Sequence, residues 1–283
     1  MEGVNQIKTP KVSVIMGIYN CEDTLPEAIE SILSQTYSNL ELIMCDDGSI
    51  DNTYKIAGDY ANKNQNIVLI KNEKNEGLAY SLNKCLTYST GTLIARQDGD
   101  DISVPERIEK QVVFLLENES ISIVSTNTTH FDDSGKWGEF KSPSFPTKLD
   151  FVKETPFSHG SAMIKKNAFN VVNGYDRTKK SLRAEDYDLW FRMYAAGFIG
   201  SNIRESLYFV RDDQEAFNRR KFRYRLIETQ VRYRGYKLLK IPYRNYIFTL
   251  RPIFVGLIPS FFYNSYRKKK YSFAKLAKGE EVL

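Results

Sequence analysis

Short apolar runs alternate with segments of helical periodicity through the first 125 residues of this 283-residue chain. Runs of apolar and β-branched residues indicate strands, and apolar residues that recur every three or four positions indicate helices. The predicted strands are 12–16, 40–45, 67–70, 92–97 and 121–125, and the predicted helices are 24–35, a segment after residue 52, 77–88 and 103–117. Strands separated by helices of this length predict an α/β fold with a mainly parallel sheet and helices on both faces.

The pattern changes after residue 125. Between His130 and Arg183 prolines and scattered aromatic residues replace the alternation, and helical spacing returns at 185–196. The chain is then basic and aromatic, and we expect it to be helical to about residue 240. The apolar stretch 246–263 is interrupted by charge and proline, so it is too short for an ordinary membrane-spanning helix. We therefore divide the chain into residues 1–125, 126–215 and a helical C-terminal extension, 216–283.

The net charge of +5 is unevenly distributed. Residues 204–283 contain 19 Lys/Arg and 7 Asp/Glu, a net charge of +12, which leaves the rest of the chain at −7. An acidic body suits a metal-binding site, and a basic tail suits an anionic surface. Nucleic acid would also match the tail, but no recognisable nucleic-acid-binding motif accompanies the charge, so we expect no such partner. The three cysteines lack metal-type spacing, and the N-terminus has no apolar targeting segment, which favours reduced thiols in a cytoplasmic protein.

Acidic loops follow two of the predicted strands. Cys45-Asp-Asp-Gly-Ser49 ends the second strand and Gln97-Asp-Gly-Asp-Asp101 ends the fourth, at the carboxyl edge where ligands bind in such sheets. The first loop alone could be an ordinary turn, because Asp, Gly and Ser are common turn residues. The second holds three carboxylates within four residues, whose repulsion a hard divalent cation would relieve. Mn²⁺ or Mg²⁺ there would suit chemistry on a diphosphate, and neither a P-loop nor a G-x-G-x-x-G motif offers another nucleotide site.

Six segments in a fixed order now make the chain recognisable. They are Val12-Ser-Val-Ile-Met-Gly-Ile-Tyr-Asn20, Ser34-Gln-Thr-Tyr37, Asp46-Asp-Gly-Ser49, Asn75-Glu-Gly77, Asp98-Gly-Asp-Asp101 and Glu185-Asp-Tyr-Asp-Leu-Trp190. Together they resemble the family 2 glycosyltransferases, in particular the bacterial exopolysaccharide, capsule and O-antigen enzymes, over roughly residues 10–215. The resemblance implies a GT-A fold, with a nucleotide-sugar-binding half at 1–125, an acceptor-binding and catalytic-base half at 126–215, and inversion at the anomeric carbon.

The resemblance also implies roles for single residues in the nucleotide site. Asp47 matches the position that hydrogen-bonds uracil, with Asp46 in support, and Asp98 and Asp100 match the D-x-D pair. Asp98 would face the ribose and Asp100 would bind the metal, so both are candidate metal-site residues. The segments expected to frame the nucleotide are Ile18, Tyr19 and Asn20 after the first strand, with Asn75 and Gly77 completing the pocket.

Asp186 is the candidate catalytic base. Its place at a predicted helix start would lower its pKa, whereas burial and neighbouring Glu185 would raise it. Taken alone, this pair could simply be acidic residues at a helix N-terminus. His159 precedes a segment that resembles the one beneath the donor sugar in the family, although a lone histidine is often structural. Tyr208 and Arg211 are further candidates to face the diphosphate.

The C-terminal extension has three interpretations. Its aromatic residues could form the core of a helical pair, or a homodimer surface, or a shallow membrane contact in which 253–262 enters the headgroup region beside Arg267-Lys-Lys-Lys270. The last interpretation fits the polyprenyl-diphosphate-linked saccharide acceptor that the resemblance suggests, and a location at the inner face of the cell membrane. We expect a UDP-sugar donor carrying galactose or glucose. The alternatives are a rhamnosyltransferase with a deoxythymidine-diphosphate donor and an inactive scaffold or binding protein.

Overall fold

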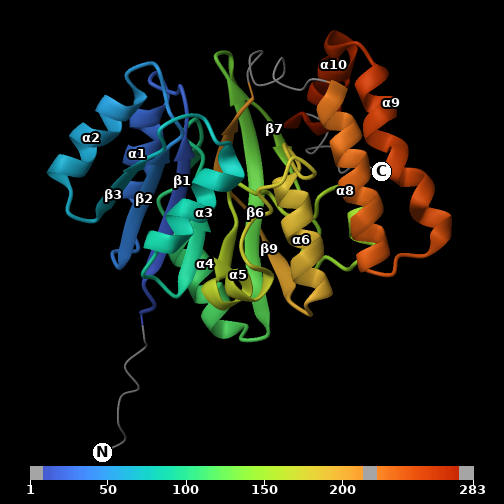
Figure 1. The fold of residues 1–283 in the computed structure, drawn as a ribbon, viewed down its shortest axis with the longest axis horizontal. Helices are drawn as coiled ribbons and strands as arrows, with labels where there is room; N and C mark the ends of the chain where they lie inside the picture. Colours follow the sequence, from blue (N-terminus) through green and yellow to red (C-terminus); the bar gives the residue numbers. More distant parts are fainter. Residues whose placement is uncertain (1–8, 213–221, 274–283) are drawn as a thin grey trace, which may run out of the picture.

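One mixed sheet of nine strands runs through the protein in the computed structural model, which describes residues 9–212 and 222–273 (Figure 1). The strand order is β3-β2-β1-β4-β8-β6-β9-β5, and β7 pairs with β6 at the side of this path. The strands are β1 (Val12–Ile18), β2 (Leu40–Asp46), β3 (Ile67–Lys71), β4 (Leu93–Arg96), β5 (Ile102–Ser103), β6 (Ile121–Asp132), β7 (Gly135–Phe140), β8 (Met163–Lys165) and β9 (Ile199–Arg211).

Helices cover both faces of the sheet, as expected. They are α1 (Leu25–Leu33), α2 (Thr53–Lys63), α3 (Leu78–Tyr88), α4 (Arg107–Glu117), α5 (Lys166–Val172), α6 (Glu185–Ala195), α8 (Phe222–Leu238), α9 (Arg251–Leu257) and α10 (Ser260–Tyr271), with short 3-10 helices η1 (Asp150–Val152) and η2 (Tyr243–Leu250). A hydrophobic core lies on each face of the sheet, and β1 contributes to both because successive side chains point to opposite faces. Val14 and Met16 join a cluster with α1 and α4, whereas Ile15 joins the cluster that contains Trp190 of α6.

The four N-terminal strands are parallel, which confirms the predicted sheet. β1 lies between β2 and β4, and β2 pairs with β3. Their carboxyl ends therefore share one edge, where the loops after β1, β2, β3 and β4 gather. Beyond β4 the sheet becomes mixed, because β8 runs antiparallel to both β4 and β6 while β9 runs parallel to β6.

Two sequence expectations about local structure were wrong. The helix expected to begin at Ser103 begins at Arg107 instead, because Ile102 and Ser103 form β5 and pair with β9. The region expected to be irregular after residue 130 contains β7 and β8.

The boundary drawn at residue 125 falls inside β6, a single strand that reaches Asp132, so both halves share one continuous sheet.

The C-terminal helices form a layer on one side of the sheet (Figure 1). α8 packs on α6 through Gly235, where any Cβ would overlap the ring of Phe191. α10 returns to β7, where Phe140 and Tyr271 stack with ring centroids 3.9 Å apart. Among the described residues no single helix is long and apolar enough to cross a membrane, although Tyr243–Leu257 with Phe261–Tyr271 passes the same test as a pair bent by 113°.

Candidate active site

A cleft of about 1150 Å³ opens at the carboxyl edge of the parallel strands. Ile18, Tyr19, Asn20, Asp47, Asn75, Gly77, Asp98 and Asp100 all line it, so most of the expected nucleotide-site residues lie together. Asp46 and His159 are not on its surface, and Asp186 is adjacent to the lining residue Glu185. The opposite walls come from the loop before α6 and from the first turns of α8.

The loops after β1 and β2 are tied to each other. Asn20 has a left-handed backbone (φ 47°), which asparagine tolerates better than most residues. Its backbone N–H donates to Ser49 Oγ at 3.1 Å, and its Oδ1 accepts from the N–H of Ile50 at 3.0 Å. Asp46 is fully buried and accepts from the N–H of Ser49. The pocket floor after β1 and β2 is therefore fixed by hydrogen bonds before any ligand binds.

Asp47 organises the loop that precedes α3. One carboxylate oxygen accepts from the N–H of Glu76 at 3.0 Å, and the other accepts from the N–H of Gly77 at 2.8 Å. Asn72 Nδ2 donates at 2.8 Å to the same Asp47 oxygen that accepts from Glu76. Gly77 has φ 93°, a conformation that side chains with a Cβ rarely adopt. Asp47 thus determines the shape of this wall, a role that its sequence motif did not reveal.

Asp98 is paired with a buried arginine. Arg96 Nη1 and Nη2 donate to the two carboxylate oxygens of Asp98 at 2.8 and 2.7 Å, and the N–H of Asp98 donates to the hydroxyl of Tyr208 at 3.0 Å. Burial alone would lower the pKa of Arg96, but the Asp98 carboxylate raises it above its ordinary value. Tyr208 is fully buried behind this loop, so it supports Asp98 rather than facing the cleft. Sequence reasoning missed Arg96, although it stands two residues before the motif.

Asp100 and Asp101 complete the acidic loop. Asp101 is buried and accepts from the N–H of Arg211 at 2.8 Å, and Arg211 Nε donates to the carbonyl of Asp100 at 3.2 Å. The pKa of Asp101 is raised well above its ordinary value, first by burial and then by the charges of Asp100 and Asp98. Negative charge is therefore crowded here, and Arg211 lines the cleft beside it.

The donor atoms at this loop fit a hard divalent cation only in part. Carboxylate oxygens are the ligands that Mn²⁺ and Mg²⁺ prefer, but both oxygens of Asp98 already accept from Arg96. Within 9–212 and 222–273, no group of three or more His, Cys, Asp or Glu residues could hold a metal ion by itself. The arrangement thus suits a cation that completes its shell with substrate oxygens, not one held by protein ligands alone. Of the expected pair of metal residues, Asp98 is positioned as the partner of Arg96.

Glu185 and Asp186 occupy the first turn of α6. Glu185 lines the cleft, and Asp186 follows it in a half-buried position. Burial and then the charge of Glu185 raise the pKa of Asp186 to about 7, against smaller opposing effects from the N–H of Tyr187 and from Arg96. Burial also raises the pKa of Glu185. The helix-terminus effect expected from sequence is therefore outweighed by burial and by the neighbouring charge.

His159 lies behind the cleft wall. Its Nε2 is 2.9 Å from the hydroxyl of Tyr175, and its ring meets Trp190 edge-on at 6.0 Å. Burial and the charge of Arg96 lower its pKa well below the ordinary value. The imidazole is therefore neutral and supports the layer beneath Arg96.

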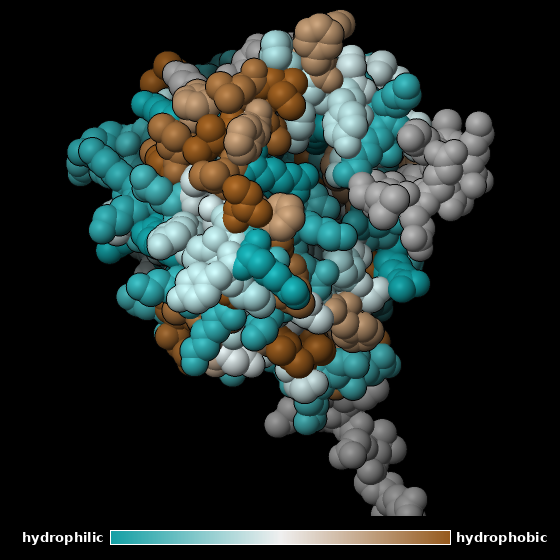
Figure 2. Space-filling model, turned by 90° about the vertical axis from the view of Figure 1, so that its right-hand side faces the viewer, coloured by the Kyte–Doolittle hydropathy of each residue, from teal (hydrophilic) through white to brown (hydrophobic). Residues whose placement is uncertain are grey.

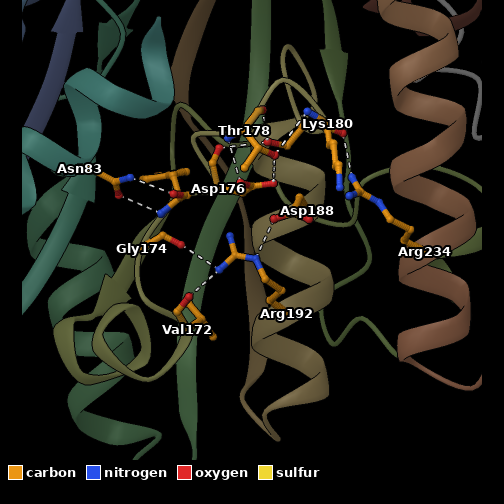
Figure 3. A network of polar contacts seen from close by, with 11 residues as sticks. Asn83, Val172, Gly174, Asp176, Thr178, Lys180, Asp188, Arg192 and Arg234 are labelled. Carbon is orange, nitrogen blue, oxygen red and sulfur yellow. Dashed lines mark hydrogen bonds and ion pairs between the residues drawn. The ribbon is translucent and has the colours of Figure 1, made fainter. Parts of the chain in front are cut away.

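Residues 173–184 form a second wall of the cleft, held by three helices. Asn83 Nδ2 of α3 donates to the carbonyl of Tyr175, Arg192 of α6 donates to the carbonyl of Gly174, and Arg234 of α8 donates to the carbonyl of Lys180 (Figure 3). Within this loop Asp176 accepts from the N–H and hydroxyl of Thr178, both at 2.9 Å. The loop is thus anchored from outside and braced internally, although its composition alone suggested irregular structure.

The C-terminal helices carry an exposed apolar area. Figure 2 shows apolar side chains gathered on the face that bears α8, α9 and α10. We call the exposed apolar residues of this region the C-terminal apolar surface; they are Tyr243, Ile247, Phe248, Phe254, Leu257, Ile258, Phe261, Phe262 and Tyr266. Phe254, Leu257 and Phe261 are 62, 66 and 74% exposed, an unusual exposure for large apolar side chains grouped together.

One expected part of this surface is engaged elsewhere. Arg267 is buried and donates to Asp212 Oδ2 at 2.8 Å, and His130 Nδ1 lies 3.0 Å from the same oxygen. Lys268 donates to Asp132 at 2.6 Å. Two residues of the basic run Arg267-Lys-Lys-Lys270 therefore fasten α10 to the rim of the cleft.

A sheet of this topology, with an acidic cleft at its carboxyl edge, defines the GT-A class of nucleotide-sugar transferases. A sequence model of glycosyl transferase family 2 matches residues 13–173, and the chain belongs to that family. It is 47% identical to the Bacillus subtilis protein named "Putative glycosyltransferase EpsE" over 262 residues, which covers 92% of this chain and 94% of that one. It is 32% identical over 268 residues to the Escherichia coli UDP-Gal:alpha-D-GlcNAc-diphosphoundecaprenol beta-1,3-galactosyltransferase, covering 92 and 96% of the two chains.

Solved structures agree on the fold. Staphylococcus aureus TarS residues 1–349 in complex with UDP aligns with a TM-score of 0.66 at 18% identity, covering 88% of this chain and 75% of that one. Mannosyltransferase PcManGT from Pyrobaculum calidifontis, in complex with GDP-Man and Mn²⁺, aligns with a TM-score of 0.62 at 18% identity, covering 95 and 79% of the two chains. The GT-A fold expected from the sequence is thus confirmed, as is the C-terminal helical extension.

Proposed function

We propose that this protein is an inverting, metal-dependent hexosyltransferase that moves galactose or glucose from a UDP-sugar to a lipid-diphosphate-linked saccharide. The observation that carries the proposal is a single cleft lined by the Asp98–Asp101 loop and by Glu185, the residue directly before Asp186. The similar Escherichia coli enzyme uses UDP-Gal and an acceptor linked to diphosphoundecaprenol, which supports both substrate classes. Bacterial capsule or exopolysaccharide synthesis is the process that consumes such products.

The proposed chemistry is a single displacement. The acceptor hydroxyl oxygen forms a bond to the anomeric carbon while the bond from that carbon to the diphosphate oxygen breaks, and UDP leaves with the electron pair. The hydroxyl proton passes to the Asp186 carboxylate, whose raised pKa of about 7 makes it a better proton acceptor than an ordinary aspartate. Attack from the face opposite the leaving group inverts the centre, so an α-linked donor gives a β-linked product.

The other residues of the cleft bind and orient. Asp47 and the Gly77 loop shape the base pocket, and Arg96 holds Asp98 in the orientation that would meet the ribose. Mn²⁺ or Mg²⁺ bound at Asp100 would neutralise charge on the departing diphosphate. His159 supports this layer from below through Tyr175.

The C-terminal apolar surface is proposed to seat the enzyme on the inner face of the cell membrane, where a lipid-linked acceptor resides. Exposed Phe254, Leu257 and Phe261 would enter the headgroup region, and Lys269 would meet anionic headgroups. Full-length protein should sediment with anionic vesicles, and a Phe254→Ser, Leu257→Ser, Phe261→Ser variant should not. Equal sedimentation of the two proteins would refute membrane binding by this surface. If the wild type instead dimerises with rising concentration and the variant does not, the surface binds a second copy of the chain.

The deciding experiment measures nucleoside-diphosphate release across a panel of nucleotide sugars, with Mn²⁺ or chelator, and with a synthetic N-acetylhexosamine-diphospho-lipid acceptor. Metal-dependent and acceptor-dependent release from one UDP-sugar supports the proposal and names the donor. Release only from deoxythymidine-diphospho-rhamnose would favour the rhamnosyl alternative. Normal function in cells of an Asp98→Ala, Asp100→Ala variant would favour an inactive scaffold.

A further inference from the structure

The cations on the cleft walls are few. Among the described lining residues, the charged side chains from the loops after β1, β2 and β4 are all acidic, namely Glu22, Asp23, Asp47, Asp51, Asp98, Asp100 and Asp101. The Lys/Arg residues of the described lining are Arg177, Arg183, Arg211 and Arg225, and all follow residue 176. Arginines in the described lining therefore come only from the C-terminal side of the chain, where Asp176, Glu185, Asp212 and Glu228 accompany them.

Two of these arginines make contacts on the nucleotide side of the cleft. Arg211 donates to Glu27 at 2.7 Å and to the carbonyl of Asp100, and it braces the acidic loop. Arg177 lies over the ring of Tyr80 on α3, 5.7 Å from its centroid, on the nucleotide side. Arg183 and Arg225 are left for the C-terminal wall, and the donor site does not explain them.

Arg183 and α8 form one wall. The Arg183 guanidinium lies 6.0 Å from the ring centroid of Tyr224, so the loop before α6 meets the first turn of α8. Arg183 has a left-handed backbone (φ 63°), a conformation that costs an arginine energy and is retained because the loop is anchored by α3, α6 and α8 (Figure 3). The anchoring holds this cation at the cleft wall two residues before Glu185.

The same wall borders the C-terminal apolar surface. A Cβ built on Gly256 of α9 would lie 3.0 Å from Arg225 Cγ, so α9 packs directly on the stem of this arginine. On either side of Gly256, Phe254 and Leu257 are 62 and 66% exposed. Arg183 in the loop before α6, Arg225 on α8 and the exposed apolar side chains of α9 therefore lie on neighbouring elements, and this series begins beside Glu185 and Asp186.

We propose that Arg183 and Arg225 bind the diphosphate of the acceptor. The proposal rests on the proposed function and deepens it. A lipid-diphospho-saccharide has three parts, and each needs its own surface: the saccharide must reach Asp186, the lipid must remain among apolar groups, and the diphosphate must lie between them. The two arginines stand at that intermediate position, and guanidinium groups bind phosphate oxygens with paired hydrogen bonds.

Nearby acids set the charge balance of this subsite. Glu228 Oε2 accepts from Arg225 Nη1 at 3.3 Å, and its other oxygen accepts from Arg232 at 3.2 Å. A bound diphosphate would replace Glu228 as the partner of Arg225, and Glu228 would retain its hydrogen bond from Arg232. Glu185 is the other carboxylate beside Arg183, and Asp176 is occupied by Thr178. The subsite can therefore give Arg225 to the ligand while Glu228 keeps a charged partner.

The test compares two acceptors that share one lipid and one sugar. One is N-acetylglucosamine-diphospho-lipid, and the other is the same sugar joined to the same lipid without phosphate. Arg183→Ala and Arg225→Ala should each raise KM for the diphosphate acceptor at least tenfold, and should leave KM for the phosphate-free acceptor and for the UDP-sugar within twofold. Arg225→Lys should recover part of the loss. Lys237→Ala removes an exposed cation from the far end of α8 and should change nothing.

Direct binding keeps the inference separate from the proposed function. Calorimetric titration of the full-length protein with each acceptor in detergent micelles needs no turnover, so it applies even if every donor proves inactive. Weaker binding of only the diphosphate acceptor by both arginine variants supports the subsite. Equal losses for the two acceptors, or weaker UDP binding, would show a structural or donor-side role and overturn it. Wild-type protein that binds the diphosphate acceptor but transfers no sugar would contradict the proposed function alone.

Discussion

Replacing Asp186 with asparagine should abolish transfer and at the same time stabilise the protein at alkaline pH. The wild-type carboxyl is half-buried in the first turn of α6, beside Glu185 and near Glu228, with Arg96 as the compensating charge. Burial and Glu185 raise its pKa from 3.8 to about 7, so the ionised form that a base requires is disfavoured by the fold. Asparagine keeps the shape and removes the charge.

The magnitude follows from the two pKa values. Between pH 3.8 and 7 the folded protein holds a proton that the unfolded chain has lost, so the free energy of unfolding falls as pH rises through this window. The cost of ionising Asp186 is about 2 kcal/mol at pH 5 and at most about 4 kcal/mol at pH 8, from the size of the pKa shift. The stability of Asp186→Asn relative to wild type should therefore increase by about 2 to 3 kcal/mol between these pH values.

Urea unfolding of both proteins at pH 5 and pH 8 measures this difference. In parallel, kcat/KM of the wild type should fall about tenfold per pH unit below pH 7, and Asp186→Asn should lose at least about a hundredfold in kcat. Glu185→Gln is the matched comparison, because it removes the neighbouring charge and should shift the wild-type pH profile to lower pH. A stability difference that is the same at both pH values would refute the raised pKa. Loss of transfer in Glu185→Gln but not in Asp186→Asn would make Glu185 the base.

Three further perturbations test the site and its support. Gly77→Ala forces a Cβ onto a backbone with φ 93° and should weaken UDP binding about tenfold by calorimetry, whereas Gly135→Ala, with φ 107° in the β6–β7 turn, should leave it unchanged. Gly235→Ala overlaps the Phe191 ring and should lower the free energy of unfolding by about 1 to 3 kcal/mol in urea, and an unchanged midpoint would contradict the packing. Chelation should weaken UDP binding at least tenfold, because the acidic loop repels a diphosphate, and Mn²⁺ should restore it; equal affinity in chelator would remove the metal from the proposal.

The sequence predicted the first half of the sheet well because each element there is marked locally. Buried parallel strands such as β1 are continuous apolar runs, and their carboxyl ends share an edge by topology alone. Asp47, Asp98 and Asp100 could therefore be assigned to one edge of the sheet from the order of the strands and loops along the chain. The two shortest strands, β5 and β8, escaped prediction for the opposite reason. β8 has three residues and β5 has two, and both form only because long-range partners supply their hydrogen bonds.

Charge pairing was the second thing that sequence could not show. Arg96 was invisible as the partner of Asp98, because neighbours at positions i and i+2 gave no reason to expect a buried bidentate pair. The basic run at residues 267–270 looked uniform, yet Arg267 and Lys268 fasten α10 to Asp212 and Asp132, whereas Lys269 is exposed. The direction of the Asp186 pKa shift likewise depended on how deeply α6 is packed.

The C-terminal helices explain why the cleft and the apolar surface should act together. α10 reaches the cleft rim through Arg267 and Asp212, where burial alone would raise the pKa of Asp212 but hydrogen bonds from His130 and Arg267 hold it well below its ordinary value. α8 supplies the opposite wall with Arg225 and packs on α9 through Gly256. A change in how α9 and α10 sit would therefore move both a wall and the rim. The proposed seating of these helices on lipid would fix the cleft relative to the membrane, as an acceptor with its diphosphate at the lipid interface requires.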